Sequence, residues 1–351
     1  MTQPASQAVS PAIRVRHLWH RFGRFDVLRD VSFDVHPGEI FGFIGPNGAG
    51  KTTTIRVMAT LLEPMAGRVE IDGLDVTIDP EAVRRIIGYM PDHAGVYERV
   101  TVREYLEFFA DAYRVPTAGT TYAVVDAVME LTDLTKLQGK LVVTMSKGMK
   151  QRLQLARTLL HDPKVLILDE PASDLDPRAR IEIRDLLVEL RAMGKTVFLS
   201  SHILTELADV CTSVAILERG RLVVAGPIHD IARRLELAQA APAVPSPQGY
   251  APQQPYAHAP PAPVEVPKRR AKLKVLAAGE VVSATLSGMP NVAEVGPGPG
   301  GTVIVTYRGD DQSLAGVVRA LVMNGIPVVG VEPERNELER IFLEVTKGEV
   351  Q

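Results

Sequence analysis

Residues 45–52 constrain this chain more than any other part of its sequence. They read Gly-Pro-Asn-Gly-Ala-Gly-Lys-Thr and match the pattern G-x-x-x-x-G-K-[ST], in which the glycines let several backbone N–H groups point into one concavity. The apolar run Ile40–Ile44 before them suits a buried strand, and residues 53–62 after them are apolar at helical spacing. A strand, a glycine loop and a helix N-terminus together predict a site for an anion.

Lys51 and Thr52 are the residues whose side chains this pattern assigns to contacts with phosphate and metal. The pattern predicts that the Lys51 ammonium reaches the β- and γ-phosphates of a triphosphate and that the Thr52 hydroxyl contacts Mg²⁺. The other residues predicted to surround the phosphates are Gly45, Pro46, Asn47, Gly48, Ala49, Gly50 and Thr53. An ordinary glycine-rich turn is the alternative, and the strand and helix on either side argue against it.

Length, charge and cysteine content exclude several classes of protein. The 351 residues suffice for two domains, and a formal net charge of −3 gives no general reason to expect nucleic acid. No apolar run reaches the roughly 18 to 20 residues of a membrane span, and residues 1–11, expected to be a flexible N-terminus, lack a signal-peptide pattern. The lone Cys211 excludes an internal disulfide and is predicted to be a small buried residue rather than a reactive thiol. We therefore expect a cytoplasmic protein.

Two further apolar runs end in polar side chains. Val165–Leu168 is followed by Asp169 and Glu170, and residues 196–199 are followed by Ser-Ser and His202. Strands of this kind lie in sheets covered on both faces, which bind ligands at the carboxyl ends of their strands. We predict that Asp169 holds Mg²⁺, that Glu170 acts as general base on a water, and that His202 donates to the γ-phosphate. Solvated acids and a structural histidine are the alternatives.

Several segments admit two interpretations. Phe22 lies between predicted strands at 13–15 and 31–35, where it could stack on a nucleotide base or belong to the core. Ser146 and Gly148 begin a predicted helix, either as an anion site or as a plain helix cap.

Residues 100 to 140 have the pattern of a helical insert. It begins with the capping box of residues 101–104, and its aromatic face is assigned to core packing: Tyr105, Phe108, Phe109 and Tyr113.

In combination, these motifs make residues 12 to about 236 resemble the ATP-binding cassette of ABC transporters. Residues 45–52 resemble its Walker A motif and residues 165–170 its Walker B motif. Residues 146–149 resemble its signature motif, with Lys147 where glycine is commoner and Met149 where glutamine is. Residues 173–176, ending in Asp176, resemble the D-loop, His202 the switch histidine, and Phe22 the adenine-stacking aromatic.

The resemblance implies a fold and a mechanism. The fold is the α/β class, a P-loop NTPase with a RecA-like core, an edge β-sheet and a helical subdomain at about 100–145. Two cassettes, expected to be a homodimer, would close head to tail, so that Ser146, Gly148 and Asp176 of one complete the ATP site of the other. A separately encoded membrane permease would be the partner, which places the chain on the cytoplasmic face of the cell membrane. A soluble ATPase acting on ribosomes or DNA and a regulatory subunit with weak hydrolysis are the alternatives.

One position departs from the family. Asp92 stands where glutamine is usual, and we expect it to ligate Mg²⁺ and to keep the coupling role with an altered metal dependence.

The remainder of the chain divides into a linker and a small domain. Residues 237–270 are rich in Pro, Ala and Gln, which favours a spacer over a partner-binding proline motif. The basic run formed by residues 268–270, Lys272 and Lys274 reads as a solvated strand entrance, with contact to anionic lipid as the alternative.

Residues 271–351 predict the order βαββαβ of a ferredoxin-like α+β domain and a last helix from Asn336. The pattern of residues 338–346 is similar to the end of cassettes in a bacterial export branch of the family, which favours an exporter.

Overall fold

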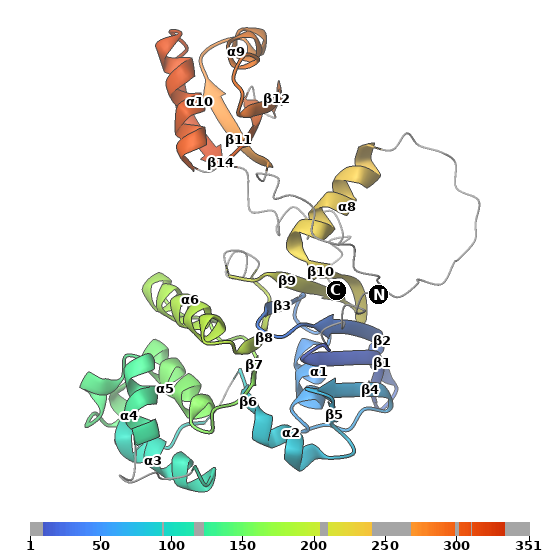
Figure 1. Cartoon of the computed structure of the whole chain (residues 1–351), viewed down its shortest axis with the longest axis vertical. Helices are drawn as coiled ribbons and strands as arrows, with labels where there is room; N and C mark the ends of the chain where they lie inside the picture. The colour runs from blue at the N-terminus through green and yellow to red at the C-terminus, as the bar shows by residue number, and fades with distance from the viewer. Residues whose placement is uncertain are drawn as a thin grey trace, which may run out of the picture. The chain divides into compact units, whose positions relative to one another are not determined.

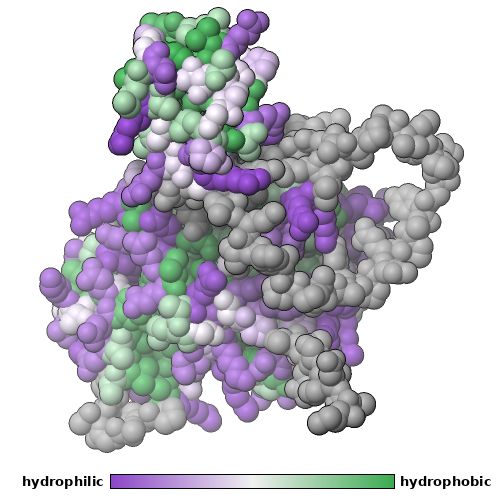
Figure 2. All heavy atoms as spheres, turned by 45° about the horizontal axis from the view of Figure 1, so that its top comes forward, coloured by the Kyte–Doolittle hydropathy of each residue, from purple (hydrophilic) through white to green (hydrophobic). Residues whose placement is uncertain are grey.

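The computed structural model describes residues 10–92, 95–115, 123–203, 210–240, 268–298, 302–309 and 311–333. Its contacts divide the chain into two compact units, and each is described by itself (Figure 1). Residues 10–240 belong to the first unit and residues 268–333 to the second. Hydrophilic residues cover much of the visible face of the first unit, with smaller hydrophobic areas between them (Figure 2).

A six-stranded sheet forms the centre of the first unit. In spatial order its strands are β10 (Arg221–Pro227), β9 (Ser213–Glu218), β3 (Ile40–Ile44), β8 (Thr196–Ser201), β7 (Val165–Leu168) and β6 (Ile87–Met90). All neighbours pair in parallel except β10, which is antiparallel to β9. The carboxyl ends of β3, β7 and β8 therefore lie along the same edge of the sheet.

Both faces of this sheet are covered, because its strands are apolar on both sides. On β3, Ile40 and Ile44 belong to one buried cluster while Phe41 and Phe43 belong to the other. The described α-helices of this unit outside the insert are α1 (Lys51–Met58), α2 (Pro80–Ile86), α5 (Lys147–Leu159), α6 (Pro177–Ala192) and α8 (Ile228–Ala240). Helix α8 continues four residues past the expected end of the cassette at 236.

An antiparallel edge sheet packs on one face. Its order is β2 (Phe25–Val35), β1 (Ile13–Phe22), β4 (Ala66–Ile71) and β5 (Leu74–Asp75). The ring of Phe33 on β2 stacks 5.5 Å from Phe41 of the central sheet, which joins the two sheets. The two short strands predicted at 13–15 and 31–35 are wrong in extent, since they are the ends of one long hairpin. Buried residues such as Leu18 and Leu28 continue the strand pattern across bulges that the short apolar runs did not reveal.

The helical insert contains α3 (Val102–Ala112) and α4 (Ala123–Leu131). The Thr101–Glu104 capping box is present as predicted. Where the insert leaves and rejoins the core, Thr101 and Leu141 form a β-bridge, and the Val142 N–H donates to the Val100 carbonyl at 3.0 Å. The insert is thus closed by backbone bonds at its base.

The prediction that the aromatic face of α3 is plain core is wrong for half of its members. Tyr105 is 1% exposed, but Phe108 is 53% and Tyr113 is 41% exposed. The buried side of α3 carries Val102, Tyr105 and Leu106, which belong to the same core cluster as residues of α5. This packing leaves part of the aromatic stripe outside.

The second unit has the predicted order βαββαβ. Its elements are β11 (Lys268–Val275), α9 (Gly279–Leu286), β12 (Val292–Pro297), β13 (Val303–Arg308), α10 (Asp311–Met323) and β14 (Val328–Pro333). The sheet order is β12-β13-β11-β14 with every neighbour antiparallel, the arrangement of a split βαβ fold. Strand β11 begins at Lys268, so the basic run lies within the strand rather than before it. The helix predicted from Asn336 falls outside the described residues, as does the linker from 241 to 267.

None of the described helices is long and apolar enough to cross a membrane.

Candidate active site

The loop of residues 45–50 joins β3 to α1 and has no room for side chains at two of its glycines. A Cβ on Gly45 would lie 2.3 Å from the carbonyl oxygen of Leu217, although the backbone of Gly45 itself is not in the left-handed region. Gly50 caps α1 with a φ of 110°, and a Cβ there would lie 2.7 Å from Leu28. The glycines therefore fix how closely the loop approaches the neighbouring strands.

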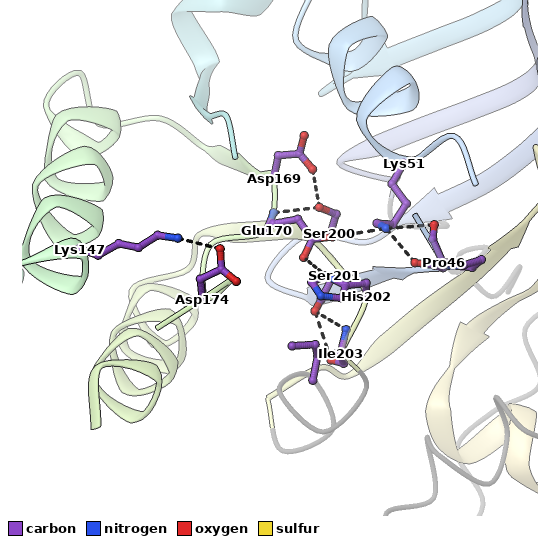
Figure 3. Close-up of polar contacts among 11 residues, drawn as sticks. Pro46, Lys51, Lys147, Asp169, Glu170, Asp174, Ser200, Ser201, His202 and Ile203 are labelled. Carbon is purple, nitrogen blue, oxygen red and sulfur yellow. Dashed lines mark hydrogen bonds and ion pairs between the residues drawn. The ribbon is translucent and has the colours of Figure 1, made fainter. Parts of the chain in front are cut away.

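Lys51 is the first residue of α1, and its side chain is only 6% exposed. Its ammonium donates hydrogen bonds to the carbonyl oxygens of Gly45 at 2.8 Å and Pro46 at 3.3 Å. The same Nζ lies 3.4 Å from Oε1 of Glu170 (Figure 3). The loop thus orients the cation that follows it, and the cation faces the carboxylate at the end of β7.

Ser200 connects the two acids that follow β7. Strand pairing sets Leu168 beside Leu199, so the residues after β7 lie next to the last residues of β8. The Ser200 hydroxyl donates to Oδ1 of Asp169 at 2.6 Å and accepts the Glu170 N–H at 3.0 Å (Figure 3). Ser200 is not among the site residues predicted from the sequence. The signal available was a serine at the end of a buried strand parallel to the strand carrying the acids.

Glu170 is held in an unusual conformation with partners on both carboxylate oxygens. Its φ is 51°, a left-handed value that costs a non-glycine residue about 1–3 kcal/mol and persists only where the surrounding structure imposes it. The Nδ1 atom of His202 lies 2.8 Å from Oε2, while Lys51 faces Oε1. Three sequence-predicted residues, Lys51, Glu170 and His202, therefore meet at one point.

Asp169 is 1% exposed, and burial raises the pKa of its carboxyl above the usual value. Hydrogen bonds from Ser200 and Thr52 oppose this rise in pKa, and the negative charges of Asp92 and Glu170 add to it. Thr52 and Asp92 are therefore close enough to act on Asp169. A buried carboxylate with a raised pKa is one that gains from a nearby cation.

The donor set of Thr52, Asp92 and Asp169 consists of oxygen atoms, which suits Mg²⁺. Among the described residues no group of three or more His, Cys, Asp and Glu side chains forms a complete metal site. Mg²⁺ is usually held by one or two carboxylates together with substrate phosphates, so this incomplete protein set fits a metal that arrives with a nucleotide.

Three predicted residues lie at other helix ends. Ser146 caps α5 by accepting the Met149 N–H at 3.3 Å, and Asp176 caps α6 by accepting the Ala179 N–H at 2.9 Å. A Cβ on Gly148 would lie 2.9 Å from the Cβ of Ala179, so these two helix starts pack closely.

The residues next to these caps form an ion pair. Lys147 Nζ lies 2.9 Å from Asp174, and Figure 3 shows this pair apart from Lys51, Glu170 and His202. The signature-like and D-loop-like segments are therefore tied to each other rather than to the phosphate loop of their own chain.

Phe22 is the last residue of β1 and is 50% exposed, with its ring 4.7 Å from that of His20. The core interpretation of Phe22 is therefore wrong, because the hairpin carries the side chain beyond the packed part of the sheet. An exposed ring remains available for stacking.

Cys211 is buried as predicted, and burial raises the pKa of its thiol.

The site consists of a glycine loop between a central parallel strand and a helix, and the lysine of this loop faces a carboxylate at the end of a strand in the same sheet. This arrangement defines a P-loop nucleotide-binding protein.

Comparisons with known proteins show to which family of P-loop proteins the chain belongs. Residues 28–173 match the family described as ABC transporter. The uncharacterized ABC transporter ATP-binding protein YhcH of Bacillus subtilis is 44% identical over 205 residues, which span 58% of this chain and 66% of that protein.

Two further similarities agree with this assignment. The Nod factor export ATP-binding protein I of Burkholderia lata is 37% identical over 219 residues, which span 62% of this chain and 72% of that protein. A solved ATP-binding subunit of an ABC transporter is 34% identical with a TM-score of 0.57, covering 64% of this chain and 94% of that one. The chain belongs to the ABC transporter ATP-binding proteins, a family of ATPases.

Proposed function

We propose that this chain is the ATP-hydrolysing subunit of an exporter, acting as a dimer of cassettes on a separate permease at the cytoplasmic face of the membrane. The observation that carries the hydrolytic part is the meeting of Lys51, Glu170 and His202. The Glu170 carboxylate is buried, with the Lys51 ammonium near one oxygen and the His202 imidazole near the other. In this orientation it can accept a proton from a water beside a phosphate that Lys51 holds.

Each side chain has a role in this proposal. Lys51 binds the β- and γ-phosphates, and Glu170 takes the proton of the attacking water. His202 holds the Glu170 carboxylate through Oε2 and contacts the γ-phosphate. Ser200 holds the backbone and side chain of the acids at the end of β7. The exposed ring of Phe22 stacks on adenine.

Thr52, Asp92 and Asp169 would hold Mg²⁺, which neutralises phosphate charge when bound. Asp92 is a carboxylate at a position where the family usually has a neutral amide. Its charge adds to the raised pKa of Asp169. We propose that this extra charge alters the dependence of hydrolysis on Mg²⁺.

The dimer is proposed because the signature-like and D-loop-like segments lie apart from the phosphate loop of their own chain. Ser146, Gly148 and Asp176 lie at the starts of α5 and α6, beside the Lys147–Asp174 pair that Figure 3 shows apart from Lys51. In the family mechanism these segments cover the nucleotide of a second cassette. A homodimer satisfies this requirement with one kind of chain.

Two observations support export through a separate permease: the similarity to a protein named for export, and a pair of exposed aromatic side chains. The relative from Burkholderia lata is named for Nod factor export. The ring of Phe108 on α3 and that of Tyr97, just before the insert, are 53% and 58% exposed and lie 5.6 Å apart. Exposed aromatic side chains that lie together are typical of protein interfaces, and we assign this pair to the permease.

The test is purification of tagged protein from detergent-solubilised cells, followed by identification of the proteins recovered with it. We expect a polytopic membrane protein with the wild type and less of it with Phe108→Ala. Phe25→Ala is the matched control, because Phe25 is 66% exposed on the edge hairpin. Recovery of ribosomal proteins or nucleic acid without a membrane protein would overturn the transporter assignment.

A further inference from the structure

The second unit presents a basic face that the ATPase role does not use. Along β11, the buried residues Ala271, Leu273 and Val275 alternate with Arg270, Lys272 and Lys274. The buried residues belong to the cluster that includes residues of α9 and α10. The cations therefore occupy the opposite face of the sheet, called the open face here because neither described helix of this unit packs on it. They follow one another at intervals of about 6.8 Å along a central strand.

Register places further cations on this face. Strand β13 sets Thr306 opposite Arg270 and Ile304 opposite Lys272, and it sets Arg308 opposite Lys268. Two cationic residues directly opposite each other in a sheet are unfavourable unless an anion neutralises them. Among the residues whose side chains the structure describes, one acid shares this face, Glu294 on β12, against the four cations Arg270, Lys272, Lys274 and Arg308. Register also sets Glu332 of β14 opposite Lys272.

Internal pairing does not account for these cations in the described part of the chain. No ion pair or hydrogen bond joins the described side chains of Arg270, Lys272, Lys274 or Arg308 to an acid. The neighbours on either side are small. A Cβ added to Gly296 on β12 would meet nothing within 4 Å, and one added to Gly330 on β14 would meet only Lys274. On β14 the position opposite Lys274 is therefore a glycine, while Thr306 and Ile304 of β13 lie beside Arg270 and Lys272. None of these neighbours is larger than isoleucine, so a broad anionic surface can approach the cations.

The face has positive charge without aromatic rings. Tyr307 is the one aromatic residue in the four described strands, and it is 1% exposed on the helix side. Single-stranded nucleic acid is held by basic grooves combined with rings on which bases stack. A surface that offers cations alone suits phosphates without bases.

We propose that the open face of this sheet, carried by Arg270, Lys272, Lys274 and Arg308, docks on anionic phospholipid headgroups of a membrane. Each Lys or Arg near an anionic membrane surface adds about fivefold to the partition, so four act strongly in combination. This proposal is separate from the ATPase role, because lipid binding and ATP hydrolysis are measured independently.

The test is co-sedimentation of the full-length protein with phosphatidylcholine vesicles that contain or lack phosphatidylglycerol. We expect binding only to the anionic vesicles, with loss of binding as salt is raised. Lys272→Glu with Lys274→Glu should lower the partition at least about tenfold. The double change Lys136→Glu with Lys140→Glu on the first unit is the control for total charge and should have little effect.

Folding of each variant is checked by circular dichroism. If the variant with glutamate at both positions does not fold, Lys272→Gln with Lys274→Gln takes its place. Equal binding to vesicles without phosphatidylglycerol would overturn the proposal. Unchanged vesicle binding by the Lys272/Lys274 variant would also overturn it. An equal loss of vesicle binding in the Lys136/Lys140 control would do the same. Binding to a single-stranded polynucleotide without binding to anionic vesicles would reassign the face to nucleic acid.

Discussion

The imidazole Nδ1 of His202 lies 2.8 Å from Oε2 of Glu170, and this contact joins the ends of two parallel strands. Glu170 follows β7 and His202 follows β8, with Ser200 bridging the backbone between them. The carboxylate is thus positioned by a partner from the neighbouring strand. Single substitutions at Glu170 and at its partners can therefore test what each side chain contributes.

Glu170→Gln should bind ATP and form the dimer but hydrolyse ATP about 10²- to 10⁴-fold more slowly, because an amide cannot accept the proton. Phosphate release and size-exclusion chromatography with ATP measure the two properties. Glu189→Gln, an exposed change on α6, is the control and should behave as wild type. Rapid turnover by Glu170→Gln would remove Glu170 as the base.

Ser200→Ala should reduce hydrolysis and stability together. It leaves the buried Glu170 N–H without an acceptor and removes a hydrogen bond from Asp169, at a cost of about 1–3 kcal/mol in the free energy of unfolding. Denaturant unfolding and ATPase rates measure these effects. Ser213→Ala removes a hydroxyl bound to Glu39 away from the site, so it should affect stability without a comparable loss of activity. Equal activity losses in the two variants would contradict a specific role for Ser200.

Asp169→Asn should stabilise the protein without nucleotide at neutral pH while abolishing Mg²⁺-dependent hydrolysis. Because the pKa of Asp169 is raised by burial, the folded state holds its proton more tightly than the unfolded state does. Stability is therefore lost as pH rises from the unfolded value towards the folded pKa, and an amide does not suffer this loss. Thermal unfolding at several pH values measures the difference, which should disappear in acid. A lower melting temperature for Asp169→Asn at neutral pH would contradict this explanation.

Asp92→Gln should move the acid limb of Mg²⁺-dependent hydrolysis to lower pH, because removing the negative charge of Asp92 lowers the pKa of Asp169. The Mg²⁺ requirement should change in the same variant. Titrations of ATPase rate against pH and Mg²⁺ measure both. If metal dependence and permease-stimulated hydrolysis both stay as in the wild type, Asp92 has no special role.

Gly45→Ala should destabilise the protein by about 1–3 kcal/mol and weaken ATP binding, since the new Cβ would displace either the loop or the Leu217 carbonyl. Gly139→Ala is the matched control, because a Cβ there meets nothing within 4 Å and the backbone is not left-handed. Its stability should stay within about 0.5 kcal/mol of wild type. Denaturant unfolding and fluorescent nucleotide binding compare the two variants.

Sequence patterns predicted the central elements because their signals are local. Strand β3 begins and ends where the apolar run does, and the capping box marks the start of α3. The positions of Asp169, Glu170 and His202 followed from the rule that parallel strands present their carboxyl ends together. The chemical roles of these residues stay predictions.

What the sequence missed depends on register and packing. Ser200 is identified only once β7 and β8 are aligned, since its partners lie about 30 residues away in sequence. The exposure of Phe108 depends on which side of α3 meets α5, and aromatic spacing alone does not choose that side. The early start of β11 was hidden because its open-face residues are charged.

The backbone bridge between Thr101 and Leu141 has a consequence for how such chains diversify. An insertion whose two ends are bonded to each other leaves the host strands in register whatever its length, because loop closure is already satisfied at the base. Changes in the length of the segment beyond that bridge therefore leave its closure intact, provided that its helices keep their packing on α5. A cassette built this way can change its partner while keeping its chemistry.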